Sequence, residues 1–240
     1  MRLSSFAGSD VGLTRSGNED SYFCGRTVFA VADGLGGHQG GEVASATAVE
    51  PLAALDGRDF AEPAEAAQAL AAAIREANSA ILDRAAGDPA LWGMGTTVTA
   101  AAVAGDRFLA LAHVGDSRAY LLRGGALRQL TTDHTVVGEL VRRGRLSPEQ
   151  AAVHPERSIL TRAVGLDPGI TVDTPDPLEL EPGDRVLLCS DGLTETVRDD
   201  RIATLLAEHE DGHEACRGLI DAANAAGGPD NITVVLLRVT

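Results

Sequence analysis

Residues 96–123 read TTVTAAAVAGDRFLALAHVGDSRAYLLR and contain three runs of strand length, each rich in apolar and β-branched residues. Gly105-Asp106 separates the first run from the second, and Gly124-Gly125 follows the third. Short glycine turns between such runs are typical of β-hairpins. Because hairpin strands pair antiparallel, this region predicts an antiparallel sheet.

Helices and further strands are expected on both sides of this region. Residues 63–86 give the clearest helical pattern, because Leu70, Ile74 and Ile81 recur at helical spacing. Further strands are predicted at residues 27–32, 170–172, 185–189 and 232–239, and further helices at residues 40–55, 135–145, 147–153, 200–208 and 214–226. Pro51 is expected to kink or end the helix that contains it. Together these elements predict an α+β layered sandwich in one domain.

Composition excludes several kinds of chemistry. The 20 basic residues are all arginine, so the chain has no lysine for a Schiff base, a Walker A phosphate loop or a Ser–Lys dyad. Acidic residues number 35, which gives a formal net charge of −15. A field of that sign repels nucleic acids and anionic membrane surfaces, so neither is expected as a partner.

Cysteine content and hydropathy suggest a cytoplasmic chain. The three cysteines are Cys24, Cys189 and Cys216, which form neither a disulfide framework nor a zinc motif. The first residues, MRLSSFAGSDVG, lack the layout of a signal peptide, and no run of eighteen apolar residues occurs. Membrane insertion is therefore not expected in this chain, while a longer, membrane-anchored parent protein stays open.

Acidic residues occur where strand-like apolar runs begin or end. They are Asp33, Asp116, Asp191 and Asp230, with Glu19 and Asp20 after a turn at Gly17-Asn18. Carboxylates that converge at strand ends repel one another unless a cation neutralises them, and hard divalent ions such as Mg²⁺ and Mn²⁺ prefer oxygen ligands. For any single one of these acids, ordinary turn chemistry is the alternative.

Seven motifs in fixed order make the sequence resemble the protein phosphatase 2C family, the metal-dependent Ser/Thr phosphatases, in the style of its compact bacterial branch. The motifs are Arg15-Ser-Gly-Asn-Glu19-Asp20, Asp33-Gly-Leu-Gly-Gly-His38 with Gly41-Glu42 and Ala44-Ser45, Gly95-Thr96-Thr97, Gly115-Asp116-Ser117-Arg118-Ala-Tyr120, Leu130-Thr-Thr-Asp133-His134, Ser190-Asp191-Gly192-Leu193 and Asp230-Asn231-Ile-Thr233. The resemblance implies a single catalytic domain over residues 1–240, folded as an α/β/β/α sandwich of two central antiparallel sheets flanked by helices.

The resemblance also implies a role for each acid. Asp33 bridges two Mn²⁺ or Mg²⁺ ions, the Gly34 carbonyl helps to hold the first ion, and Asp191 and Asp230 bind the second. Asp116, with Asp191, holds a third and weaker ion. The implied reaction is hydrolysis of phosphoserine and phosphothreonine in proteins, by in-line attack of a water or hydroxide that bridges the metals.

Three residues near the N-terminus have implied roles in the reaction itself. Glu19 and Asp20 orient metal-bound waters, and Arg15 receives the substrate phosphate, for which its planar fork is suited. Some family members carry a histidine directly after the Asp-Gly pair, where this chain has Leu35. The general acid is therefore unassigned, with His38 or a metal-bound water as candidates.

Residues 136–157 are predicted to form a mobile flap that selects protein substrates. Arg142, Arg143, Arg145 and Arg157 give this segment a local positive charge, and it has few large apolar anchors. The alternative is a solvated surface helix. The implied partners are phosphorylated bacterial proteins, among them a Ser/Thr kinase that phosphorylates itself.

Two other functions remain as alternatives. Gly115-Asp116-Ser117-Arg118-Ala119 approaches the GxSxG elbow of a serine hydrolase, with Asp191 and then His209 or His213 in the required order, but a strand-like run follows Ser117. The second alternative is a scaffold of the same fold that binds phosphoproteins without turnover. His113 and His134 are expected to be structural rather than catalytic.

Overall fold

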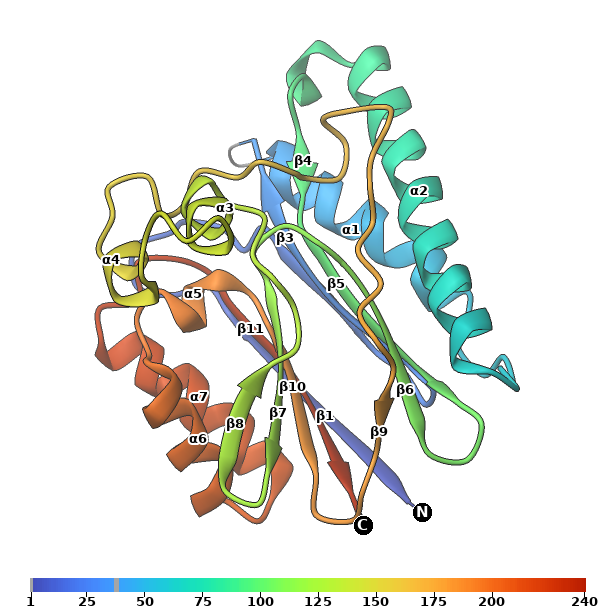
Figure 1. Ribbon diagram of the computed structural model, residues 1–240. Helices are drawn as coiled ribbons and strands as arrows, with labels where there is room; N and C mark the ends of the chain where they lie inside the picture. Colours follow the sequence, from blue (N-terminus) through green and yellow to red (C-terminus); the bar gives the residue numbers. More distant parts are fainter. Residues whose placement is uncertain (1, 37–38) are drawn as a thin grey trace.

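Two antiparallel β-sheets pack face to face between outer layers of helices (Figure 1) in a computed structural model that describes residues 2–36 and 39–240. The predicted α+β class and the α/β/β/α order of layers are confirmed. His38, suggested above as a candidate acid, lies outside the described residues. No helix in the described ranges is both long enough and apolar enough to cross a membrane.

The first sheet has five strands and carries the C-terminal helices on its outer face. Its strands, in spatial order, are β1 (Leu3–Asp10), β11 (Ile232–Val239), β10 (Arg185–Cys189), β7 (Arg118–Arg123) and β8 (Ala126–Gln129). Helices α5 (Asp191–Thr194), α6 (Asp199–Glu208) and α7 (Gly212–Ala225) cover it. Ile202 and Leu219 of these helices are fully buried against Leu187 and Leu236 of the sheet.

The second sheet lies under the N-terminal helices. Its main order is β2 (Asp20–Cys24), β3 (Val28–Leu35), β5 (Val98–Ala104), β6 (Phe108–Val114) and β9 (Leu178–Glu179), and β4 (Gly95–Thr96) pairs with the end of β3. Helices α1 (Gln39–Ala53) and α2 (Pro63–Gly87) cover its outer face, and the short 3₁₀ helix η1 (Pro89–Leu91) follows α2.

The first residues of strand β3 are apolar because both faces of the strand are covered. Val28 and Ala30 face the helices α1 and α2, whereas Phe29 and Val31 face the other sheet. All four side chains are fully buried, because a strand in the middle of a four-layer sandwich has no face toward water. The same reasoning applies to β11, where alternate residues belong to the two cores.

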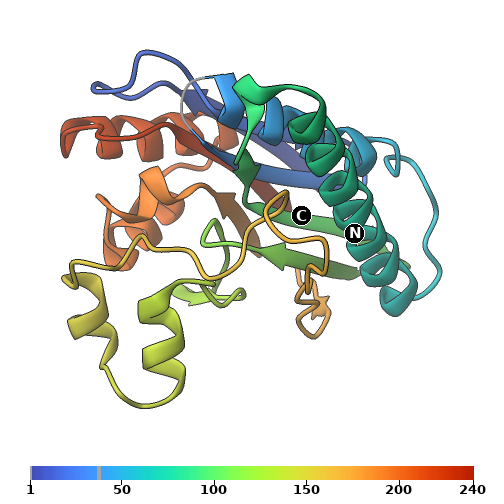
Figure 2. The same cartoon turned by 90° about the horizontal axis from the view of Figure 1, so that it is seen from above.

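Two short helices lie outside the layers. They are α3 (Val136–Arg142) and α4 (Pro148–Ala152), and Figure 2 shows them standing apart from the sheets and from the outer helices. Both fall within the predicted flap. The segment is anchored at its base by backbone pairing between Thr135 and Leu160.

The structure corrects some local predictions. Residues 170–172 form no strand; the chain there makes a single bridge from Asp173 to His113, because Pro168, Pro175 and Pro177 interrupt the supply of backbone N–H donors. Pro51 lies inside α1, which ends two residues later. Strands β1, β2, β8 and β9 were not predicted.

Candidate metal centre

Acidic residues of both sheets meet at one edge of the sandwich. Asp33 lies near the end of β3, Asp191 begins α5 directly after β10, and Asp230 lies just before β11. Asp20 begins β2, and Asp116 follows β6. We call these five residues the acidic centre.

Asp33 and Asp191 lie close to each other, although they are carried by different sheets. Each carboxyl group is near enough to affect the pKa of the other. Burial, reinforced by the charges of neighbouring acids, raises the pKa of each well above its ordinary value. Two such groups cannot both stay ionised side by side without a positive charge between them.

Asp20 is connected to the opposite sheet by Ser190. The Ser190 hydroxyl donates to Asp20 Oδ2 over 2.7 Å, while the Thr233 backbone N–H donates to the same hydroxyl over 2.9 Å. Burial is the largest influence on Asp20 and raises its pKa to about 6, against hydrogen bonds that act in the opposite direction. Ser190 therefore favours the ionised form of Asp20.

Asp116 lies on a tight turn and is only 9% exposed. Burial, followed by the charge of Asp133, raises its pKa to about 7. The turn is joined to β3 by hydroxyl groups: Ser117 and Thr97 are 2.6 Å apart, and Thr97 accepts the backbone N–H of Asp33 over 3.0 Å. These bonds fix the distance between the turn of Asp116 and the strand of Asp33.

Arg15 lies at the open side of the centre. Its Nη2 is 2.7 Å from Asp230 Oδ2, and its side chain is 46% exposed. Asp230 Oδ1 accepts the backbone N–H of Asn231 over 2.8 Å. Asn231 also accepts the backbone N–H of Glu19 over 2.8 Å, so Glu19 is tied to the strand that follows Asp230.

Gly34 lies where a side chain would not fit. A Cβ at this position would collide with the backbone carbonyl of Gly41 and would lie 2.6 Å from the carbonyl of Glu19. A Cβ on Gly41 would in turn collide with the Glu19 carboxylate. The glycines thus allow α1, β3 and Glu19 to approach closely beside Asp33.

The residues present fit hydrated divalent cations. Within residues 2–36 and 39–240, no group of three His, Cys, Asp or Glu side chains is arranged closely enough to hold a metal ion by itself. However, Asp20 Oδ1 and Asp191 Oδ1 are buried without a hydrogen-bond partner in the described part of the chain. The donor set consists of oxygen atoms only, and Mg²⁺ and Mn²⁺ accept a few carboxylates together with several waters.

The sequence of this chain matches a family profile described as protein phosphatase 2C over residues 16–218. The chain belongs to the protein phosphatase 2C family. The predicted resemblance is therefore confirmed.

Relatives within the phosphatase 2C family match along almost the whole chain. It is 47% identical to the serine/threonine protein phosphatase PstP of Mycobacterium tuberculosis, over 97% of this chain and 44% of the relative. It therefore spans less than half of that relative's length. The serine/threonine phosphatase stp of Listeria monocytogenes is 40% identical, over 96% of this chain and 93% of its own.

A solved structure of the M. tuberculosis phosphatase PstP/Ppp superimposes with a TM-score of 0.93 at 44% identity, covering 99% of this chain and 98% of that one. A structure of the PstP catalytic domain in complex with two manganese ions has a TM-score of 0.89 at 42% identity, covering 99% of each chain. These phosphatase 2C structures share the fold of this chain from end to end.

The structure brings the candidate metal ligands, Arg15, and the two water-orienting acids to one region. They are Arg15, Glu19, Asp20, Asp33, Gly34, Asp116, Asp191 and Asp230. Sequence reasoning did not identify the supporting roles of Ser190, Asn231 and Thr97, although all three stand in the quoted motifs. Their partners are distant in the chain, so no local pattern could assign them.

The serine-hydrolase alternative is wrong. Ser117 is fully buried, its hydroxyl faces Thr97, and strand β7 follows it rather than a helix. A nucleophilic serine must be exposed to its substrate. His113 and His134 are buried and hydrogen-bonded, as expected for structural histidines.

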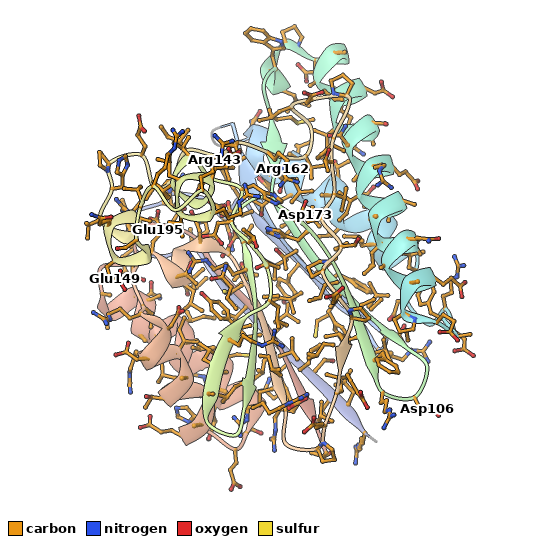
Figure 3. All side chains as sticks on the ribbon, in the orientation of Figure 1. Asp106, Arg143, Glu149, Arg162, Asp173 and Glu195 are labelled. Atoms are coloured by element: carbon orange, nitrogen blue, oxygen red, sulfur yellow. The ribbon has the colours of Figure 1, made fainter. Side chains whose placement is uncertain are left out.

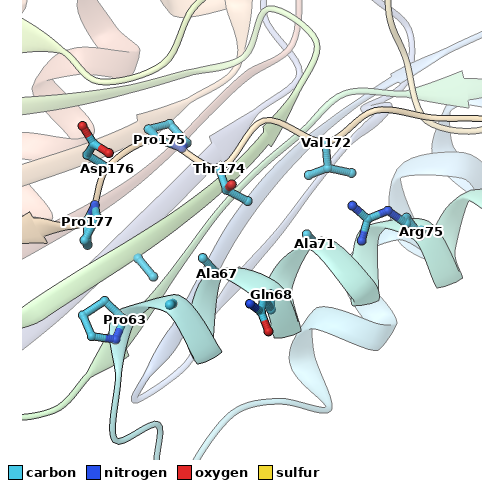
Figure 4. A pocket seen from close by; sticks show the side chains of 12 residues that line it. Pro63, Ala67, Gln68, Ala71, Arg75, Val172, Thr174, Pro175, Asp176 and Pro177 are labelled. Atoms are coloured by element: carbon cyan, nitrogen blue, oxygen red, sulfur yellow. The ribbon is translucent and has the colours of Figure 1, made fainter.

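Two cavities of the protein lie away from the acidic centre. A cavity of about 390 Å³ lies between α2 and residues 172–177 (Figure 4), and another of about 310 Å³ is lined by residues between 160 and 171. Among the described residues, neither cavity is lined by a member of the acidic centre.

Proposed function

We propose that this chain is a metal-dependent phosphatase that hydrolyses phosphoserine and phosphothreonine in proteins. The observation that carries the proposal is the approach of the Asp33 and Asp191 carboxyl groups across the two sheets, in a chain of the phosphatase 2C family. The manganese ions in the related PstP structure support Mn²⁺ or Mg²⁺ as the cofactor.

We assign the metal ligands from the acidic centre. Asp33 would bridge two ions, with the Gly34 carbonyl on the first and Asp191 and Asp230 on the second. Asp116 and Asp191 would hold a third, weaker ion. When bound, such ions acidify a coordinated water and screen the charge of the phosphate.

Arg15 binds the substrate phosphate in this proposal. Its guanidinium is half exposed beside Asp230, so two of its N–H groups can reach phosphate oxygens from the solvent side. The ion pair with Asp230 keeps the guanidinium close to the acidic centre. A phosphate held there would lie beside the acidic centre, where bound cations would offset its charge.

Glu19 and Asp20 orient the waters that take part in hydrolysis. An ionised carboxylate accepts hydrogen bonds from water through both oxygens and donates none. Ser190 donates to Asp20 and so favours its ionised form. Asn231 fixes the backbone of Glu19, and the tight contact with Gly41 limits where the Glu19 carboxylate can lie.

We infer that residues 1–240 form one catalytic domain, since the chain covers 99% of the PstP catalytic-domain structure. The substrates would be phosphorylated bacterial proteins, including a Ser/Thr kinase that phosphorylates itself. The three free cysteines agree with action in the cytoplasm. Incubation with an autophosphorylated bacterial Ser/Thr kinase, followed by mass spectrometry of its phosphosites, tests the kinase as a substrate.

The direct test is turnover of a panel of phosphopeptides and of p-nitrophenyl phosphate, with Mn²⁺ and with EDTA. We expect hydrolysis of phosphoserine and phosphothreonine peptides with Mn²⁺ only, and a loss of several orders of magnitude in kcat for Asp33→Ala. Asp106→Asn is the matched control, because Asp106 is exposed in the turn between β5 and β6 (Figure 3), at the opposite end of β6 from Asp116. Phosphopeptide binding without turnover would instead support a non-catalytic scaffold, and full activity in EDTA would contradict the proposal.

A further inference from the structure

The turn that carries Asp116 is held by His134. The Gly115 backbone N–H donates to His134 Nδ1 over 3.0 Å, and the His134 backbone N–H donates to the Gly115 carbonyl over 2.8 Å. Gly115 has a φ of +109°, and a Cβ there would lie 2.6 Å from the Thr97 side chain. His134 thus shares two hydrogen bonds with Gly115, whose backbone conformation only glycine adopts readily.

The hydrogen bonds define the protonation of the His134 ring. A backbone N–H can only donate, so Nδ1 is the acceptor, and the proton of the neutral ring is on Nε2. Nε2 lies 3.1 Å from Asp173 Oδ2, to which it donates. The ring is fully buried, so both of its nitrogen atoms have a protein partner and neither depends on water.

Asp173 is held in turn by its own neighbours. Arg162 Nη1 donates to Asp173 Oδ1 over 2.6 Å, and Figure 3 shows these two side chains next to each other. The Asp173 backbone exchanges two hydrogen bonds with His113, at 2.8 and 3.0 Å. The His113 ring packs against the His134 ring at 4.7 Å between centroids. His134 therefore has one ring orientation available.

Asp116 needs such support because its neighbours repel it. It lies close enough to Asp33 and Asp191 for its charge to affect both. A carboxylate on a glycine turn would relieve this repulsion by rotating toward solvent unless its backbone were fixed. The hydrogen bonds from His134 act on the peptide immediately before Asp116.

We propose that His134 is a positioning residue that directs Asp116 toward Asp191, and that Asp173 fixes the His134 ring for this task. The inference rests on the proposed function, in which Asp116 and Asp191 hold the third, weaker ion. His134 should therefore affect the binding of the third ion only. The two core ions, on Asp33, Asp191 and Asp230, do not depend on the bond between Gly115 and His134.

Two substitutions of His134 separate its two hydrogen bonds. His134→Asn keeps an acceptor at the position of Nδ1, whereas His134→Gln keeps a donor at the position of Nε2 and loses the acceptor for Gly115. Calorimetric titration of the whole chain with Mn²⁺ should show the weakest site within about threefold of wild type in the Asn variant. In the Gln variant, the Mn²⁺ affinity of that site should fall by about 10–100-fold, the range observed when a residue that positions a metal ligand is lost. The affinities of the tighter sites should not change.

Coupling to Asp116 distinguishes positioning from a general structural role. In an Asp116→Asn background, His134→Gln should cause no further change in Mn²⁺ binding. His209→Gln, a partly exposed histidine at the end of α6, is the control and should bind as wild type. If His134→Gln does not fold, Asp173→Ala removes the hydrogen bond that orients the His134 ring and should weaken the same site by about tenfold, the lower end of that range.

Several results would overturn the inference. One is a His134→Gln variant that binds every ion as wild type does. Others are equal loss of all ions in both His134 variants, an undiminished effect of His134→Gln in the Asp116→Asn background, or unchanged binding in Asp173→Ala. A wild-type chain that binds no Mn²⁺ would instead contradict the proposed function as well, so the two failures are distinguishable.

Discussion

Asp20 and Asp33 lie directly opposite each other in the antiparallel pair of β2 and β3. Side chains at opposed positions project from the same face of a sheet, and like charges placed this way destabilise the pair. Most sheets avoid this arrangement. Here the strand register creates the repulsion, and cations bound at the same edge would relieve it.

Arg15→Ala should raise KM for phosphopeptides more than it lowers kcat. The loss of a charge-assisted phosphate contact costs about 1.5–3 kcal/mol, which corresponds to roughly a tenfold to hundredfold rise in KM. Arg15→Lys should restore part of the affinity, because lysine supplies a charge without the planar fork. Steady-state kinetics measure both; Arg26→Ala, at an exposed arginine paired only loosely with Asp56, is the control. An Arg15→Ala variant with the KM of the wild type would show that Arg15 does not bind the substrate phosphate.

The metal-free protein should lose stability as the pH rises from about 4 to about 7. The pKa values of Asp20 and Asp116 are raised from 3.8 to about 6 and about 7, with burial as the largest cause. In this window the native state binds protons that the unfolded chain has released, so the free energy of unfolding falls with rising pH, by a few kcal/mol in all. This contribution is complete below the unfolded pKa and is lost above the folded one.

Thermal unfolding in EDTA between pH 4.5 and 8 measures this effect. Saturating Mn²⁺ should abolish the fall in Tm, and Asp33→Asn should raise the Tm of the metal-free protein at pH 8 by removing one buried charge. A Tm in EDTA that stays level or rises across this range would show that the acids do not repel one another in the native state.

Neutralising the flap should affect protein substrates selectively. Arg142, Arg143 and Arg145 lie on the exposed segment formed by α3 and its following turn, and Arg143 pairs with Glu139 at 2.9 Å. We expect their joint replacement by glutamine to lower kcat/KM for phosphoproteins several-fold and to leave p-nitrophenyl phosphate nearly unchanged.

A triple variant with the same change in charge provides the control for the flap. Arg84, Arg201 and Arg217 are exposed on α2, α6 and α7, and their replacement by glutamine should leave both substrates unaffected. An equal response of both substrates to the flap variant, or no response, would favour a solvated surface helix without a role in selection.

The sequence identifies those elements whose residues are buried on both faces. Residues 185–189 and 232–239 were predicted as strands with the observed bounds, because a short continuous apolar run is typical of a strand buried on both faces. Strand β1 was missed, since LSSFAGSD is rich in serine and glycine and is stabilised by pairing with β11, 236 residues away at its first pair, Leu3 with Val239. Residues 170–172 look like a strand locally, but have no partner strand along their length.

The acids of the candidate centre could be predicted because each begins or ends an apolar run. Their supporting bonds could not, because the partners are far apart in the sequence. Ser190 and Asp20 are 170 residues apart, and Asn231 and Glu19 are 212 apart. The bond from Gly115 to His134 also joins two separate motifs, and depends on a ring orientation that only the folded chain defines.

The acidic centre should hold divalent cations through Asp33, and calorimetric titration of the metal-stripped protein with Mn²⁺ measures this binding. We predict that the wild-type chain and Asp106→Asn bind at least two ions. Asp33→Asn should lose both core ions together, because it removes the ligand that they share. A wild-type chain that binds no Mn²⁺, or an Asp33→Asn variant with unchanged stoichiometry and affinity, would contradict the account.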